Sequence, residues 1–370
     1  MKINMLALVV LFFILSAFVA SHVAVYFSFV RFFGITDIAI KNILLWSLVF
    51  LGSSFFISTF FAHQFENSFS RFYYLFANFW MGLLVNLVLF LILAWIIIWV
   101  SGWVGAVPKE KLLGILVILA SLIYSVYGAW NAFSPKITKM EIMIDSLPKE
   151  WVGKKIVQIS DVHLGHVYRE KHFINAIEKI NALEPEVVVF TGDLFDGTDG
   201  SLKAFLEPIN NIKAPAFFIT GNHETYLGID DAYDAISKTK LIPLRDSLEN
   251  INGLQFIGID YPLKGGDRDI SKLIPAMKGY DQFAPSILLI HEPVQIEAAK
   301  KVGISLQLSG HTHVGQLFPF SFITSAVFKG YDYGFKREGS FAIYTSSGFG
   351  GWGPPMRTEK RSEIVEITLK

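Results

Sequence analysis

The chain has 370 residues, of which 52% are hydrophobic and 17% charged, and its formal net charge at pH 7 is zero. A soluble domain averages about 25% charged residues, so an apolar region must dilute the charge. The balance of charge gives no sign of a nucleic-acid-binding tail. The absence of cysteine excludes disulfides, cysteine-ligated zinc and a cysteine nucleophile, so any metal must be held by His, Asp, Glu, Asn and water.

Four long uncharged runs occupy the first third of the sequence, at residues 6–30, 42–63, 72–108 and 112–135. A helix needs about 20 apolar residues to cross a bilayer, so residues 1–135 are predicted to hold four transmembrane helices. A cleaved signal peptide is the alternative for the first run, but that run exceeds a signal core of roughly 7–15 residues and three more follow. We therefore expect a multi-pass protein of a bacterial-type inner or plasma membrane. Lys and Arg flank both sides equally, so the orientation stays open.

The second part of the sequence has regular charges and short apolar runs between turns. Residues 136–153 are predicted to form a linker or entering strand, and residues 154–370 an α/β domain, because apolar strands alternate with helix-like stretches. The predicted strands are Lys155–Ser160, Val187–Thr191, Ala216–Thr220, Leu254–Ile259, Ser286–Ile290, Ser305–Leu308, Phe341–Thr345 and Glu363–Leu369, and the predicted helices are Glu170–Ala182 and Ile229–Thr239.

Five predicted strands end on residue types that bind metals. In α/β folds ligands bind at the carboxyl ends of the strands, and alternate residues of an extended Asp-x-His or His-x-His point the same way. Carboxylates, imidazoles and one amide suit Mn, Fe or Zn better than Mg or Ca, and their number favours two ions. The alternative is a set of exposed turns that happen to carry histidines. The strand ends carry Asp161 and His163, Asp193 and Asp196, Asn222, His223 and Glu224, His291, and His311 and His313.

These blocks resemble those of the calcineurin-like metallophosphoesterases over roughly residues 154–369. The resemblance implies a two-sheet β-sandwich flanked by helices. The apolar N-terminal region and the closing SSGFGGWGPPMR are similar to a membrane-anchored YaeI/YkuE-like subgroup and to transmembrane proteins with a metallophosphoesterase domain. The matching blocks are Asp161-Val162-His163, Gly192-Asp193, Gly221-Asn222-His223-Glu224, His291 and Gly310-His311-Thr312-His313.

The resemblance also implies residue roles and hydrolysis of a phosphomonoester, phosphodiester or pyrophosphate bond, in which two ions activate water. Gly197 stands where Ser/Thr protein phosphatases carry Arg, which disfavours that activity. Glu224 is expected to be a turn or helix-start residue. The implied roles are Asp161, His163 and His313 on one ion, Asn222, His291 and His311 on the other, Asp193 bridging both, and His223 contacting the phosphate or protonating the leaving group, oriented by Asp196.

The substrate is the least determined feature. Residues 317–333 are unusually aromatic for a loop and are expected either to line an acyl groove or dip into the membrane interface, or to pack on the protein itself. Arg357 could hold a second phosphate or pair at the surface, His166 could lie at the pocket rim, and His172 is expected on the solvated surface. A membrane anchor favours a lipid or lipid-linked phosphate such as UDP-diacylglucosamine, with shorter nucleotide or cell-wall phosphates as alternatives.

Two other classes of function compete with the enzyme. A non-catalytic membrane scaffold could keep the fold without the chemistry, but every motif position here is filled. A transporter usually carries Asp, Glu, Lys or Arg within its spans, and these spans carry none. The sequence therefore predicts a membrane-anchored phosphoesterase with two metal ions.

Overall fold

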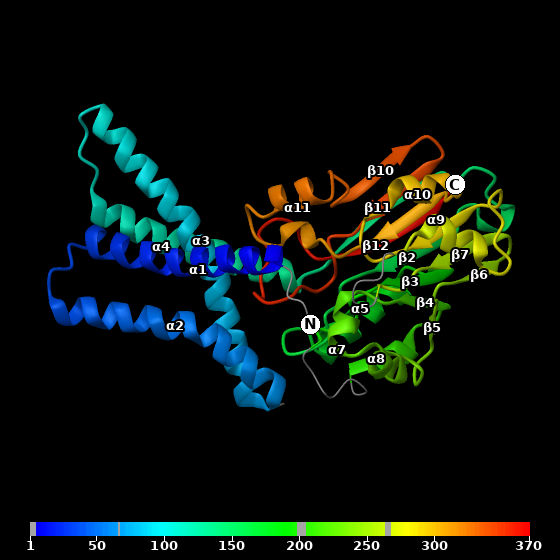
Figure 1. The fold of residues 1–370 in the computed structure, drawn as a ribbon, viewed down its shortest axis with the longest axis horizontal. Coiled ribbons are helices and arrows are strands. Elements are labelled where there is room, and N and C mark those ends of the chain that lie inside the picture. The colour runs from blue at the N-terminus through cyan, green and yellow to red at the C-terminus, as the bar shows by residue number, and fades with distance from the viewer. Residues whose placement is uncertain (1–4, 66, 198–204, 263–267) are drawn as a thin grey trace. The chain divides into compact units, whose positions relative to one another are not determined.

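The computed structural model describes residues 5–65, 67–197, 205–262 and 268–370, and the chain divides into two compact units (Figure 1). The helical unit comprises Met1–Ala129 together with Gly353–Met356. The α/β unit comprises Trp130–Trp352 together with Arg357–Lys370.

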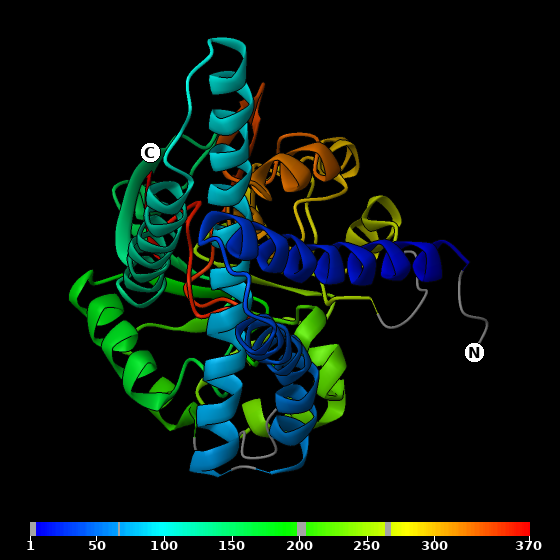
Figure 2. The same cartoon turned by 90° about the vertical axis from the view of Figure 1, so that its left-hand side faces the viewer.

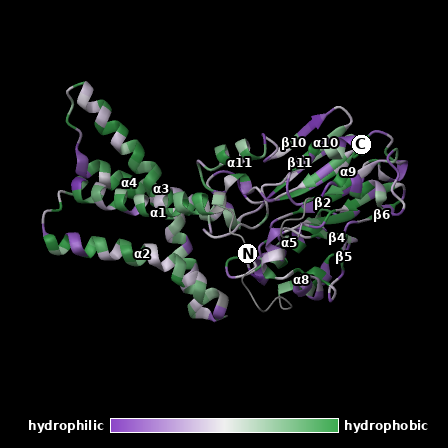
Figure 3. Cartoon of the chain, in the orientation of Figure 1, coloured by the Kyte–Doolittle hydropathy of each residue, from purple (hydrophilic) through white to green (hydrophobic). Residues whose placement is uncertain are grey.

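Within its described residues the helical unit contains four helices that are long and apolar enough to cross a membrane, as predicted (Figure 3). Helices α1 and α2 both contact α3, which runs across them (Figure 2). Large apolar side chains such as Phe12, Trp46 and Phe72 are more than 60% exposed. The helices are α1 (Met5–Phe32), α2 (Ile38–Gln64), α3 (Ser68–Trp103) and α4 (Glu110–Phe133).

The charged residues that interrupt the apolar runs lie at the helix ends. Asp37 caps α2 by accepting from the backbone N–H groups of Ala39 and Ile40. Arg31, in the last turn of α1, pairs with Glu110 at the start of α4 at 2.8 Å. The ends of the helices are therefore satisfied without placing a charge in their apolar centres.

A short C-terminal segment belongs to the helical unit although it lies more than 200 residues further along the chain. Met356 is fully buried, and a Cβ added at Gly82 of α3 would lie 2.4 Å from its sulfur. Asn86, one turn further along α3, is buried and donates to Ser125 of α4 at 2.8 Å. The glycine thus provides the space into which the methionine packs.

The α/β unit is a sandwich of two mixed six-stranded sheets, which confirms the predicted fold class. The first sheet has the order β1-β12-β2-β3-β4-β5 and the second β10-β11-β9-β8-β7-β6. The strands are β1 (Lys136–Ile142), β2 (Lys155–Ile159), β3 (Val187–Thr191), β4 (Ala216–Ile219), β5 (Leu241–Pro243), β6 (Ser247–Ile251), β7 (Leu254–Gly258), β8 (Ser286–Leu289), β9 (Leu306–Ser309), β10 (Gly334–Glu338), β11 (Phe341–Thr345) and β12 (Glu363–Leu369).

Apolar residues on both faces of the central strands build three layers of core. Val189, Phe256 and Leu308 belong to the core between the two sheets. A second core packs α5 and α8 on the outer face of the first sheet, and a third packs α9 and α10 on the second. Burial on both faces explains why these strands are continuous apolar runs. The helices are α5 (Glu170–Ala182), α7 (Asn222–Leu227), α8 (Ile229–Ile236), α9 (Ile270–Leu273), α10 (Ile296–Lys301) and α11 (Ser321–Val327).

Two segments differ from the sequence expectation. Residues 321–327, expected to be part of an aromatic loop, form helix α11, and none of its residues is buried. His172, expected in solvent, packs its ring against Phe349 and Tyr168, with ring centroids 4.6 and 5.3 Å away.

Candidate metal centre

The predicted ligands lie at one edge of the sandwich because their strands run parallel there. In the first sheet β2, β3 and β4 are parallel neighbours, and in the second β8 and β9 are. Backbone hydrogen bonds join successive loops, from Asp161 N to Gly192 O at 3.0 Å and from Gly310 N to His291 O at 2.8 Å. The carboxyl ends of strands from both sheets therefore supply the site.

Five of the predicted ligands have a left-handed backbone. A positive φ is uncommon for residues other than glycine and is strained unless the surroundings impose it. Such strain gathers at functional sites, and here it turns side chains from consecutive loops inward. The residues are Asp161 (φ 54°), His163 (φ 51°), Asp193 (φ 51°), His311 (φ 73°) and His313 (φ 47°).

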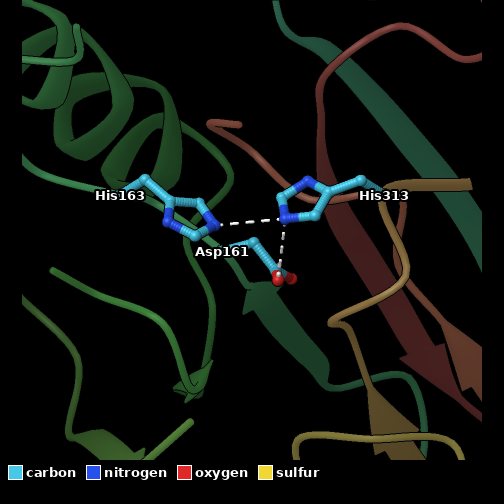
Figure 4. Close-up of side chains that lie close together, drawn as sticks. All are labelled: Asp161, His163 and His313. Atoms are coloured by element: carbon cyan, nitrogen blue, oxygen red, sulfur yellow. Dashed lines mark hydrogen bonds and ion pairs between the residues drawn. The ribbon is translucent and has the colours of Figure 1, made fainter. Parts of the chain in front are cut away.

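The first cluster is formed by Asp161, His163 and His313 (Figure 4). The Nε2 atoms of the two histidines lie 3.1 Å apart, and His313 Nε2 lies 3.4 Å from Asp161 Oδ1. All three side chains are buried. The backbone N–H of His311 also donates to the Asp161 carboxylate, at 3.0 and 3.1 Å from its two oxygens, and helps to orient it.

The second cluster is formed by Asp193, Asn222, His291 and His311. His291 Nε2 lies 3.1 Å from Asp193 Oδ2 and 3.2 Å from Asn222 Oδ1. His311 presents Nδ1, which lies 2.9 Å from Asn222 Oδ1 and 3.2 Å from His291 Nε2. His311 and His313 therefore use different ring nitrogens toward different clusters.

One carboxylate oxygen faces both clusters. Asp193 Oδ2 lies 3.1 Å from His291 Nε2 in the second cluster and 3.9 Å from His163 Nε2 in the first. The other oxygen, Oδ1, accepts from the backbone N–H of His223 at 2.9 Å. This hydrogen bond fixes the carboxylate between the two groups.

The two clusters fit cations. Buried nitrogens and oxygens that approach each other within hydrogen-bond distance, with lone pairs converging, are stabilised by a shared positive charge. Imidazole nitrogens with carboxylate and amide oxygens are the donors that transition metals prefer. The residues present therefore suit two metal ions, one in each cluster.

In the metal-free centre, the opposite charges of Asp193 and His291 shift the pKa of both groups. Burial raises the pKa of the Asp193 carboxyl, but His291 and its neighbouring imidazoles outweigh burial and hold that pKa well below its usual range. Burial by itself would lower the pKa of His291, yet the charge of Asp193 raises it to about 10. Without metal, His291 therefore favours its doubly protonated, cationic form, and a metal ion that binds the ring must displace one of the two protons.

Glu224 organises the centre without pointing at the clusters. Its two oxygens accept hydrogen bonds from the backbone N–H groups of Asp193, Leu194, Phe195 and Gly221 at 2.6–3.1 Å. This agrees with the expected turn role, but its hold on the Asp193 loop is not visible in the spacing. The Gly221–Glu224 interval matches a capping box and indicates only the hydrogen bond from the Gly221 N–H to Glu224.

His223 and Asp196 are linked differently from the expectation. His223 Nδ1 lies 2.8 Å from the backbone carbonyl of Asp196, not from its carboxylate. That carboxylate instead lies 3.7 Å from His163 Nδ1. Burial and His163 lower the pKa of His223. Asp196 thus orients His223 through its main chain and His163 through its side chain.

Arg357 lies in a different place from either expected one. The side chain is fully buried. Its Nη2 donates to the Ser347 carbonyl and lies 2.7 Å from His313 Nδ1, so the guanidinium lies on the side of a predicted metal ligand that faces away from the first cluster. His166 is also buried, and neither residue is among the described residues that line the pocket.

A pocket of about 530 Å³ opens over the centre. Its floor carries ligands of both clusters and His223, and its wall carries apolar side chains of α11 and its flanks. Sequence reasoning did not single out Tyr226 or the individual residues of this wall. The lining residues are Asp193, Asn222, His223, Tyr226, His311, Thr312, His313, Gly315, Phe320, Ile323, Thr324, Phe328 and Trp352.

The chain matches one protein-family profile and is similar to several proteins from other organisms. The profile of the calcineurin-like phosphoesterases matches residues 154–315. An uncharacterized metallophosphoesterase of Helicobacter pylori is 36% identical over 70% of this chain and 71% of its own length. A transmembrane protein with metallophosphoesterase domain of Danio rerio is 33% identical over 69% and 62%. The uncharacterized metallophosphoesterase YkuE of Bacillus subtilis is 31% identical over 66% and 90%.

Proposed function

Because the chain belongs to the calcineurin-like metallophosphoesterases, which are metal-dependent hydrolases, we propose that it uses two divalent ions to hydrolyse a phosphoester of a lipid or lipid-linked substrate. The observation that carries the proposal is Asp193 Oδ2, which faces His291 Nε2 at 3.1 Å and His163 Nε2 at 3.9 Å. A carboxylate in that position can bridge two ions. The ions would be Mn, Fe or Zn.

The residues of each cluster would hold one ion, and Asp193 would be shared. When bound, two such ions supply the positive charge that stabilises a phosphoryl group during in-line displacement and lower the pKa of water. The ligands of one ion would be Asp161, His163, Asp193 and His313, and those of the other Asp193, Asn222, His291 and His311.

His223 is the proposed proton donor to the leaving oxygen. It lines the pocket beside the metal ligands, and the carbonyl of Asp196 fixes its Nδ1, which leaves Nε2 for the substrate. Burial lowers its pKa in the free protein, but an anionic phosphoryl group beside the ring would favour the protonated form. The same ring can then donate a hydrogen bond to a phosphoryl oxygen or a proton to the departing group.

The helical unit supports the proposal of a membrane substrate. Its four helices are long and apolar enough to span a bilayer, and relatives from Danio rerio and Bos taurus are named transmembrane proteins. We propose a multi-pass protein of a bacterial inner or plasma membrane, where anchoring raises the local concentration of lipid phosphates. UDP-diacylglucosamine is one candidate. The competing role, a non-catalytic scaffold, is disfavoured because the ligands of both clusters converge.

The test combines metal content with hydrolysis. Full-length protein supplemented with Mn should retain about two ions per chain and cleave a chromogenic phosphodiester. Asp193→Asn should abolish hydrolysis and reduce the metal content while the unfolding transition remains cooperative. Asp230→Asn, an exposed carboxylate at the start of α8, is the matched control and should retain both. Full activity in Asp193→Asn, or folded protein that takes up no metal, would refute the proposal.

A further inference from the structure

The pocket is much larger than the group that the metal centre would bind. A phosphoryl group occupies about the volume of two or three waters, at about 30 Å³ each. The pocket measures about 530 Å³, so most of it is available to the alcohol part of the ester. Its shape is therefore informative about that alcohol.

The wall of the pocket is apolar and begins directly beside a metal ligand. The rings of Phe328 and His311 lie 5.9 Å apart, edge to face. Phe320, Ile323 and Thr324 continue the wall along α11, since residues at these intervals share one face of a helix. Trp352 adds a further apolar surface. A phosphoryl group on the floor would thus have hydrocarbon, not water, on one side.

The residues that line the pocket also disfavour a substrate with a second phosphate. Among the described residues that line the pocket there is no Lys or Arg. A second phosphate is normally held by such side chains, and Arg357, which the sequence suggested for it, lies buried behind His313. A nucleoside diphosphate would therefore find no cationic partner on this wall, whereas a hydrocarbon chain would find a matching surface.

Helix α11 remains exposed on its other side as well. Phe322 is 69% exposed and Val327 is 64% exposed, neither lines the pocket, and none of the helix is buried in the protein. A helix that is apolar on several faces is normally covered by protein or lipid. The pocket face of α11 adjoins the proposed metal ligands, and the same chain carries four helices suited to a bilayer. An amphiphile from that bilayer, with a phosphoryl head and a hydrocarbon chain, is the occupant that fits the metal ligands and the apolar wall together.

We propose that the pocket face of α11 binds the hydrocarbon chain of a substrate that carries a single phosphoryl group, a long-chain alkyl or glycerolipid phosphoester. The inference rests on the proposed function, because the metal floor must take the phosphoryl end. It narrows the substrate class by placing the chain against Ile323 and Phe328 and by excluding a second phosphate from this wall, which removes the diphosphate UDP-diacylglucosamine from the candidates.

The first experiment compares p-nitrophenyl phosphodiesters whose second alcohol is methanol, octanol or thymidine, so that the leaving group is constant. Full-length Mn-loaded protein should prefer the octyl over the methyl ester in kcat/KM. Ile323→Ser should reduce the octyl-to-methyl ratio about tenfold. Phe322→Ser, at a neighbour that is also more than half exposed but does not line the pocket, should leave the ratio unchanged.

The outcomes separate this inference from the proposed function. Hydrolysis of the methyl ester with no octyl preference, or with a ratio that Ile323→Ser does not change, overturns the inference and leaves the proposed function standing. A preference for the thymidine ester that Ile323→Ser abolishes assigns the wall to a nucleotide and also overturns it. No hydrolysis of any ester by protein with its full metal content overturns both.

A second readout does not depend on activity. Dodecylphosphonate carrying a diazirine at the chain end, which has no ester bond to hydrolyse, is photolysed with Mn-loaded full-length protein, and labelled peptides are mapped by mass spectrometry. Saturable labelling at Ile323 or Phe328, competed by unlabelled dodecylphosphonate and absent from Phe322, is expected. Saturable labelling confined to the N-terminal helices would overturn the assignment.

Discussion

Glu224→Gln tests whether this buried carboxylate holds the Asp193 loop in place. Oε1 accepts from the N–H groups of Leu194 and Phe195 at 2.8 and 3.1 Å, and Oε2 from those of Asp193 and Gly221 at 3.0 and 2.6 Å. Glutamine keeps one oxygen and places an NH₂ group against the other two donors. Each buried donor left unpaired costs about 1–3 kcal/mol, so the variant should lose about 2–6 kcal/mol of unfolding free energy.

The assay is thermal unfolding of the metal-free full-length protein. For a domain of this size about 2–4 °C of Tm corresponds to 1 kcal/mol, so Tm should fall by about 4 °C or more. Burial and Asp193 raise the pKa of Glu224 to about 7, so the comparison is made at about pH 8.5, where the carboxylate is ionised.

The control is an exposed carboxylate that pairs with one lysine. Glu297 is 86% exposed and pairs with Lys300 at 2.8 Å, and such pairs contribute about 0–1 kcal/mol. Glu297→Gln should therefore barely change Tm. Equal Tm values for the two variants would show that the four N–H groups do not depend on Glu224, and would refute the reasoning.

Three further predictions concern the centre and its surroundings. A Cβ at Gly310 would lie 2.2 Å from Asp161 Oδ2, so Gly310→Ala should lose at least part of the bound metal. The control is Gly102→Ala, whose Cβ would meet nothing within 4 Å, and it should keep the metal. Full metal content in both variants would contradict the predicted role of Asp161. Burial lowers the pKa of His172 to about 4, below its unfolded value of about 6.5, so the folded protein binds fewer protons than the unfolded chain between these pH values and loses stability as the pH falls through them. Between pH 7.5 and 5, His172→Phe should therefore lose about 1–2 kcal/mol less stability than the wild type, measured by thermal unfolding. An equal loss in the two proteins would count against the lowered pKa. His223→Asn should keep its metal but slow turnover about 10²–10⁴-fold, most for poor leaving groups, and a uniform small effect would exclude proton donation.

Much of the fold and the ligand set could be predicted because short-range rules govern them. Runs long enough to cross a bilayer predict helices such as α1 and α4 directly, whatever their neighbours are. Burial on both faces makes strands such as β3 readable as apolar runs. Parallel strands place their carboxyl ends at one edge, so Asp161 and His313 can be expected together although 152 positions separate them.

What the sequence determined by itself is therefore the kind of residue that each strand end delivers. Only the tertiary structure decided which atom of each residue does what. Asp196 turns its carbonyl to His223 and its carboxylate toward His163, and Arg357 is buried behind His313 instead of facing substrate. These choices depend on backbone dihedral angles and on packing between segments far apart in the chain. Residue spacing along the chain does not encode either of them.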